Sequence, residues 1–153
     1  MEKTANRVVL ESLIDTVYDS IEGYRKAHDI ANSPHIKQAF ADQLAKRQKT
    51  LDALNAQLVA VGGELVTKGT LTGALHRTWT SITDLFGTDD KTAVERVEEG
   101  EDYLAGKFEE ALEHTDLDMA TRTAVQAAYA EIKEGERLAD RLSNTTEGAF
   151  GRN

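Results

Sequence analysis

The chain has 153 residues and no cysteine, and its 27 acidic residues outnumber 18 Lys and Arg residues to give a net charge of −9. This length suits one domain. Without thiols, the chain has no disulfide, thiolate metal site or cysteine nucleophile, which fits a reducing compartment. The excess of negative charge, with no basic cluster to offset it, argues against a nucleic-acid partner. We therefore expect one cytoplasmic domain that binds no nucleic acid.

The hydropathy pattern offers no membrane segment. No run approaches the ~18 apolar residues that a spanning helix needs, and residues 1–7 are polar with no apolar segment behind them. The sequence thus predicts neither membrane association nor a secretory leader. Pro34 is the single proline, which is typical of long unbroken helices.

Apolar residues recur every three or four positions in four segments, and this spacing predicts amphipathic helices. No segment alternates with period two for long enough to form a strand. Four such helices bury their apolar stripes best against one another, as a bundle. The periodicity ends after residue 143, so we expect a bundle domain over 1–143 and a flexible tail over 144–153. The predicted helices span about residues 5–31, 34–61, 90–114 and 119–143.

Helix-ending residues stand between these segments. Ser33 suits an N-cap, and Pro34 suits a first helical position, where its missing N–H costs nothing. Gly62-Gly63 predicts a helix stop. The turn before the last helix offers Asp116 or Asp118 as its N-cap.

The link between the second and third helices, residues 62–88, is far longer than the usual connection in a bundle. A long link allows the helices that it joins to run parallel, as in a ferritin-like arrangement of two helical hairpins. Apolar residues within it predict a short extra helix over about 70–86. We expect His76 and Trp79 to anchor this crossover on the bundle, Trp79 by burying its large ring.

A carboxylate-bridged two-metal centre in such a bundle uses Glu-x-x-His, because residues three apart on a helix point the same way. None of the four histidines has a glutamate three positions before it. Zinc-ligand spacings of histidine are missing too. The serines lack a strand–turn–helix elbow. The sequence predicts no catalytic residue, no metal ligand and no cofactor.

Charged residues nevertheless interrupt the apolar stripes. Arg47 stands between core positions of the second helix and Glu101 between those of the third, while Glu136 and Glu22 lie near the stripes of the fourth and first. Buried charges must meet one another. We expect Arg47, Glu101, Glu136 and Glu22 to form a buried polar cluster, since a guanidinium matches carboxylates geometrically. The alternative is a metal pocket of Glu22, Glu101 and Glu136, holding iron or manganese.

Several segments carry a resemblance to a bacterial ferritin-like four-helix-bundle family of unknown function. They are Glu22–Tyr24 in the first helix, Gly73–Trp79 in the crossover, and Gly100–Asp102 and Phe108–Leu112 in the third helix. The chain resembles this family over about residues 8–143. The crossover segment is the most specific of these, because long amphipathic helices resemble one another easily.

The resemblance implies a ferritin-like bundle and a stress-related or storage role, and no known reaction. The chain departs from the family pattern at Lys46, where an acidic residue is expected, and at Glu136, where histidine is expected. Both departures weigh against an oxidase site.

Three functions compete at this point. The first is a non-enzymatic, stress-associated bundle that acts through partner or homodimer contacts. The second is a carboxylate-rich two-metal oxidase or storage protein using iron or manganese. The third is an acidic adaptor that presents the third and fourth helices to a protein partner.

Overall fold

The computed structural model describes residues 2–67 and 90–150, which form four α-helices and, within those ranges, no strand. This confirms the predicted all-α class and places most helix ends close to their predicted positions. The predicted crossover helix over 70–86, with His76 and Trp79, lies outside the described residues. The helices are α1 (Glu2–Ile30), α2 (Pro34–Ala60), α4 (Asp90–Leu112) and α5 (Met119–Phe150).

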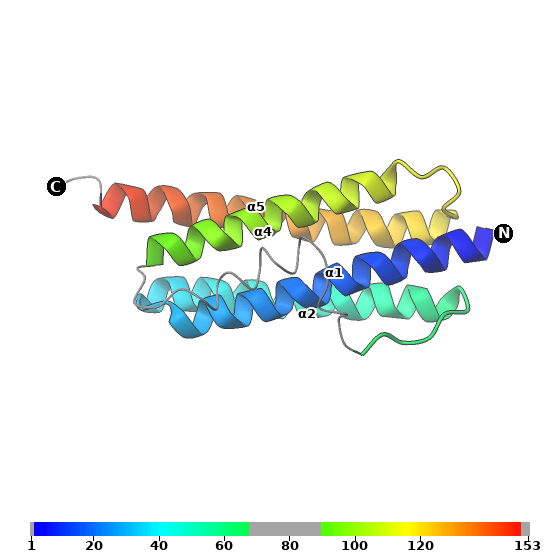
Figure 1. The fold of residues 1–153 in the computed structure, drawn as a ribbon, viewed down its shortest axis with the longest axis horizontal. Coiled ribbons are helices and arrows are strands. Elements are labelled where there is room, and N and C mark those ends of the chain that lie inside the picture. Colours follow the sequence, from blue (N-terminus) through cyan, green and yellow to red (C-terminus); the bar gives the residue numbers. More distant parts are fainter. Residues whose placement is uncertain (1, 68–89, 151–153) are drawn as a thin grey trace.

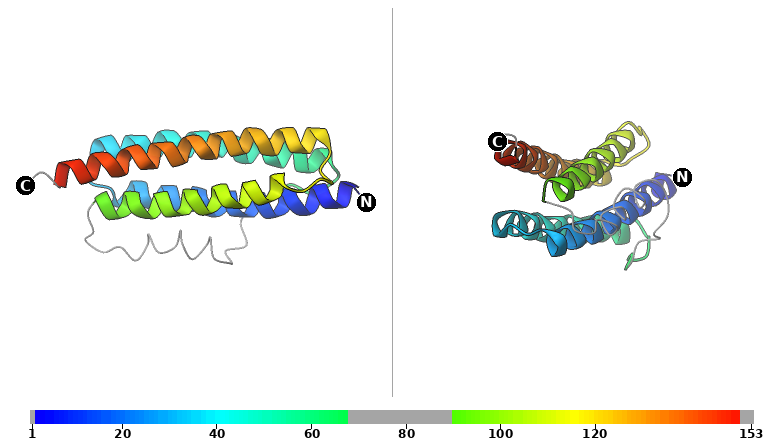
Figure 2. Two further views of the ribbon diagram at one scale, coloured as in Figure 1. Left: turned by 90° about the horizontal axis from the view of Figure 1, so that it is seen from above. Right: turned by 60° about the vertical axis from the view of Figure 1, so that its left-hand side comes forward.

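The helices form an elongated bundle of two hairpins, α1 with α2 and α4 with α5 (Figures 1 and 2). Helix α1 also packs against α4, and α2 packs against α5. The starts of α2 and α4 lie at the same end of the bundle, where the backbone N–H groups of Asn32 and Ser33 donate to the two Asp90 carboxylate oxygens at 2.7 and 2.9 Å. These two helices therefore run in the same direction, which explains why the link between them must be long.

The core is the set of apolar stripes that the periodicity predicts. Leu10 and Val17 of α1, Leu54 of α2, Phe108 of α4 and Ile132 of α5 are all at most 1% exposed. Burying one such side chain stabilises the fold by ~1.5–3 kcal/mol. The apolar stripes fill the interior toward both ends of the bundle. Near its middle, polar side chains interrupt them and form the site described below.

Helix α2 begins and ends at the residues expected from the sequence. Pro34 is its first residue. At its other end Gly62 has a φ of 90°, a left-handed conformation that favours glycine. The N–H of Gly62 donates to the carbonyl of Val59 at 3.0 Å and that of Gly63 to the carbonyl of Leu58 at 2.9 Å. This pair of hydrogen bonds is a Schellman motif, and it confirms the predicted end of the helix.

Asp118 rather than Asp116 caps α5. Its Oδ1 accepts a hydrogen bond from the N–H of Thr121 at 2.7 Å. Its Oδ2 accepts from Asn6 Nδ2 at 3.0 Å, and its own N–H donates to Asn6 Oδ1 at 3.1 Å. Because Asn6 is fully buried, this pair joins the start of α1 to the start of α5.

We expect Asp118→Ala to lower the free energy of unfolding by about 1–2 kcal/mol. The loss of a cap costs ~0.5–2 kcal/mol. The buried Nδ2 of Asn6 loses its acceptor as well, whereas Asn6 Oδ1 keeps the backbone N–H of residue 118. Asp116→Ala in the same turn is the matched control and should change stability by less than ~0.5 kcal/mol, because Asp116 is exposed. Urea unfolding followed by circular dichroism measures both. Equal effects of the two substitutions would contradict the assignment of the cap.

The C-terminal end of α5 differs from the expectation. The helix continues to Phe150, whereas the sequence predicted that residues 144–153 would form a flexible tail. Backbone hydrogen bonding propagates residue by residue once a helix has formed, and no proline interrupts this stretch, so the helix outlasts its apolar stripe. Among the described helices, none combines the length and the hydrophobicity needed to cross a bilayer.

Candidate functional site

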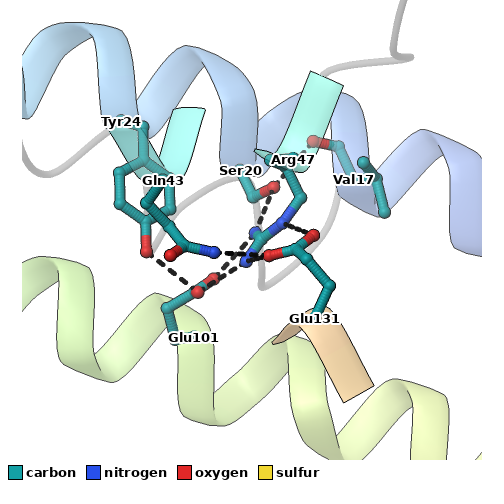
Figure 3. Close-up of polar contacts among 7 residues, drawn as sticks. All are labelled: Val17, Ser20, Tyr24, Gln43, Arg47, Glu101 and Glu131. Atoms are coloured by element: carbon teal, nitrogen blue, oxygen red, sulfur yellow. Dashed lines mark hydrogen bonds and ion pairs between the residues drawn. The ribbon is translucent and has the colours of Figure 1, made fainter. Parts of the chain in front are cut away.

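The middle of the bundle holds a fully buried arginine, Arg47 of α2 (Figure 3). Its Nη1 and Nη2 donate to the two oxygens of Glu101 on α4 at 2.8 and 2.6 Å. Its Nε and Nη2 donate to the two oxygens of Glu131 on α5 at 2.8 and 3.0 Å. Nη1 also donates to the hydroxyl of Ser20 on α1 at 2.9 Å. All five N–H donors of the guanidinium thus have a partner, and the partners come from the three other helices.

Two neutral side chains donate further hydrogen bonds to the carboxylates of Glu101 and Glu131. The hydroxyl of Tyr24 donates to Glu101 Oε2 at 2.9 Å, and the side-chain amide of Gln43 donates to Glu131 Oε2 at 2.6 Å. The guanidinium carbon lies 5.5 Å from the centre of the Tyr24 ring, within cation–π range. We call these six residues the Arg47 network: Ser20, Tyr24, Gln43, Arg47, Glu101 and Glu131.

Gly135 of α5 leaves room for the network. A Cβ built at this position would overlap Glu101 Oε2 and would lie 3.0 Å from Arg47 Nη2 and 3.2 Å from Gln43 Nε2. Only a residue without a side chain allows α5 to come this close. Glu131 precedes Gly135 by four residues, so both face the network.

Burial and the neighbouring charge act in opposite directions on the pKa values of Arg47 and Glu101, and in the same direction on that of Tyr24. Burial opposes the positive charge of Arg47, but the carboxylate of Glu101 raises the pKa of Arg47 well above its usual value. Burial raises the pKa of Glu101, and Arg47 counteracts part of that rise. The pKa of Tyr24 is well above its usual value, because of burial and then the negative charge of Glu101. Tyr24 is therefore a neutral hydroxyl that donates a hydrogen bond.

Two members of the predicted cluster lie elsewhere. Glu22 is half exposed and pairs with Arg25, one turn along α1, at 2.8 Å. Glu136, whose side chain is 16% exposed, pairs with Lys133 one turn earlier on α5. The reason is rotational: Glu136 follows the inward-facing Gly135 and is turned from it by about 100°. Glu131 takes the place that the sequence analysis gave to Glu136. The signal for Glu131 was a glycine four residues later on a buried stripe, which marks a close approach.

The residues at the bundle centre do not fit the iron or manganese pocket that the sequence offered as the alternative to a polar cluster. Glu22, Glu101 and Glu136 do not come together, and each forms its own ion pair. All four oxygens of Glu101 and Glu131 accept hydrogen bonds from Arg47, so a cation there would meet a guanidinium of like charge. Over residues 4–67 and 90–144, whose side chains the structure describes, no three or more His, Asp or Glu side chains are grouped so that they could hold a metal ion.

A second set of charged groups lies where α4 meets α5. Burial and a hydrogen bond with Asp140 raise the pKa of Glu98 to about 7. Burial and a hydrogen bond with Glu136 raise the pKa of Asp102 to about 7. Burial would raise the pKa of Glu136 as well, but hydrogen bonds from Asp102 and Lys133 hold it below its usual value. Each pair of carboxyl groups therefore retains a proton to a higher pH than isolated carboxyls do.

These carboxyl pairs predict a pH dependence of stability. In the unfolded chain Glu98 and Asp102 titrate near ~4, so the folded protein binds more protons between ~4 and ~7. Their stabilising contribution is complete below pH ~4 and is lost as the pH rises toward ~7. We expect the double variant Glu98→Gln, Asp102→Asn to gain stability relative to the wild type as the pH rises from 4 to 8, measured by thermal melting. A difference that is independent of pH would contradict this expectation.

Comparison with known proteins places this chain in a family. Residues 7–114, which cover most of α1 and all of α2 and α4, match the family described as "Domain of unknown function (DUF2383)". The chain belongs to this family. Five members of the Arg47 network lie within the matched residues, whereas Glu131 lies beyond them.

One solved structure shows the same fold. It is the crystal structure of a conserved hypothetical protein from Mycobacterium tuberculosis, with a TM-score of 0.72 and 16% sequence identity over 91% of this chain and 97% of that one. At this identity the similarity concerns the fold alone. No curated protein matches the chain in sequence. The described residues of this DUF2383 family member thus form four helices, and the function of the family is unknown.

Proposed function

We propose that this DUF2383 protein is a non-enzymatic bundle of ferritin-like topology that acts through contacts with a protein partner or a second copy of itself. The observation that carries the proposal is the guanidinium of Arg47, whose five donors are all used by the protein's own groups. It occupies the place where a ferritin-like oxidase carries its metals. Two hairpins with α2 and α4 running in the same direction support the topology. A stress-related role in the cytoplasm belongs to the same proposal.

The network suits a structural role better than a chemical one. A catalytic acid or base must reach a substrate, yet Arg47 and Glu101 are fully buried. Glu131 keeps 13% of its side chain exposed, but both of its oxygens are held by Arg47 and Gln43. A buried ionic network of this kind specifies which faces of the helices meet, as polar core residues do in coiled coils.

Metal analysis tests this proposal. The protein is produced in medium rich in iron and manganese, purified without chelator, and analysed by inductively coupled plasma mass spectrometry. We expect far less than about one metal ion per chain. The contrary result is about one or more tightly held ions per chain, lost in Glu101→Ala and kept in Glu22→Ala, which changes only an exposed pair. The metal content of the wild type alone decides if Glu101→Ala does not fold.

A further inference from the structure

A groove between α2 and α5 lies beside the Arg47 network. It has a volume of about 270 Å³, and its lining includes the half-buried Ala39 and Leu138 and the buried Gln43. Sites for drug-sized ligands usually measure ~300–1,000 Å³, so this groove suits a smaller molecule. Its apolar residues offer a surface for a short aliphatic group.

Gln43 provides the groove with a hydrogen-bond acceptor, its side-chain carbonyl oxygen. Its side-chain nitrogen donates to Glu131 Oε2 at 2.6 Å, and because a carboxylate only accepts, this bond fixes the orientation of the amide. Among residues 4–67 and 90–144, no group donates to the carbonyl oxygen of Gln43. This oxygen is not one of the side-chain atoms that are both buried and unpaired, so it keeps contact with solvent in the groove. A ligand that enters the groove can therefore donate a hydrogen bond to it.

The rim of the groove carries both signs of charge. Asp42 and Glu134 are acidic, and Lys46 and Arg141 are basic. Lys46 Nζ lies 3.7 Å from Glu134 Oε1, so this exposed pair joins α2 to α5 at the groove. A ligand with a single charge would meet a repelling group at this rim. A small molecule with one charge of each sign is complementary to it.

We propose that the groove binds a free α-amino acid with an aliphatic side chain. Its ammonium group donates to the carbonyl oxygen of Gln43, near Asp42. Its carboxylate lies toward Lys46 and Arg141, and its side chain packs on the apolar lining of the groove. This inference goes beyond the proposed function and does not depend on it.

Hydrogen bonds connect Gln43 in the groove to Arg47 at the bundle centre. The same amide that contacts the ligand holds Glu131, and Glu131 accepts two hydrogen bonds from Arg47. Occupancy of the groove should therefore shift the nuclear magnetic resonance signals of the Gln43 side-chain amide and of the Arg47 Nε–H. A ligand bound elsewhere on the surface would leave the Arg47 signal unchanged.

The test is a titration of ¹⁵N-labelled full-length protein with L-leucine, L-valine or L-alanine. We expect at least one to shift both signals in a saturable way with a Kd of about 1 mM or tighter, which is about −4.1 kcal/mol. Isoamylamine and 4-methylpentanoate each lack one charge of leucine. They should bind at least about tenfold more weakly than the amino acids, a difference of ~1.4 kcal/mol.

Two variants locate the site. Ala39→Met fills the groove and should abolish the shifts, whereas Ala45→Met, at an exposed position of α2 outside the groove, should keep them. The inference is overturned if none of the three amino acids produces saturable shifts at about 10 mM, tenfold above the expected Kd. Equal binding of the singly charged analogues, or binding retained in folded Ala39→Met, overturns it too.

Discussion

Replacing Arg47 with methionine should lower the free energy of unfolding by about 3–5 kcal/mol, the typical cost of removing one partner of a buried ion pair. The substitution leaves the carboxylates of Glu101 and Glu131 without their shared cation. The hydroxyl of Ser20 loses its donor, and the Tyr24 ring loses the cation beside it. Equilibrium unfolding in urea at neutral pH measures the loss.

Lys46→Met is the matched control, because Lys46 is the neighbouring residue of α2 and forms an ion pair with Glu134 at the surface. Exposed pairs contribute at most ~1 kcal/mol, so this variant should unfold close to the wild type. If Arg47→Met also stays within ~1 kcal/mol of the wild type, Arg47 is not the buried centre of the bundle.

Substitution of Gly135 with alanine should have the second-largest effect. In most helix interiors alanine is more stable than glycine by ~1 kcal/mol. At Gly135, however, the added methyl group would overlap Glu101 Oε2 and crowd Arg47 Nη2. Both atoms belong to a hydrogen-bonded network that cannot shift without losing bonds. Overpacking of this kind typically costs ~1–3 kcal/mol, so we expect Gly135→Ala to be destabilising.

We expect Gly106→Ala, on the neighbouring helix α4, to be stabilising and so to serve as the contrasting variant. A Cβ at Gly106 has nothing within 4 Å, so this variant should gain up to ~1 kcal/mol from helix propensity. One kcal/mol corresponds to a shift of about 2–4 °C in the melting temperature of a protein of this size. Differential scanning calorimetry should therefore show Gly135→Ala melting below the wild type and Gly106→Ala above it. A gain in both variants would show that α5 does not approach the network closely.

The sequence predicted the helices well because their signals are local. Apolar spacing fixes each stripe, Pro34 starts α2, and Gly62 ends it in a left-handed conformation. The end of α5 was missed because helical bonding continues beyond the last apolar residue. The choice between Asp116 and Asp118 needed the three-dimensional structure, since the decisive partner, Asn6, lies 112 residues away in the sequence.

The site was harder to predict than the helices. Arg47 and Glu101 stand at inward positions of their own helices, so periodicity alone pointed to both. On the fourth helix, periodicity did not single out one inward polar residue, because Glu131, Gly135 and Glu136 all lie near its apolar stripe. Choosing among them requires the rotation and closeness of α5 relative to α2 and α4, which is set by packing between helices. Ser20 and Gln43 carried no charge to mark them.

The most direct test is a crystal structure of the protein prepared in medium rich in iron and manganese, with anomalous diffraction recorded near the metal absorption edges. We predict planar guanidinium density between the carboxylates of Glu101 and Glu131, with no anomalous peak there. An anomalous peak bridging those two carboxylates, with the side chain of Arg47 turned out to solvent, would contradict the account.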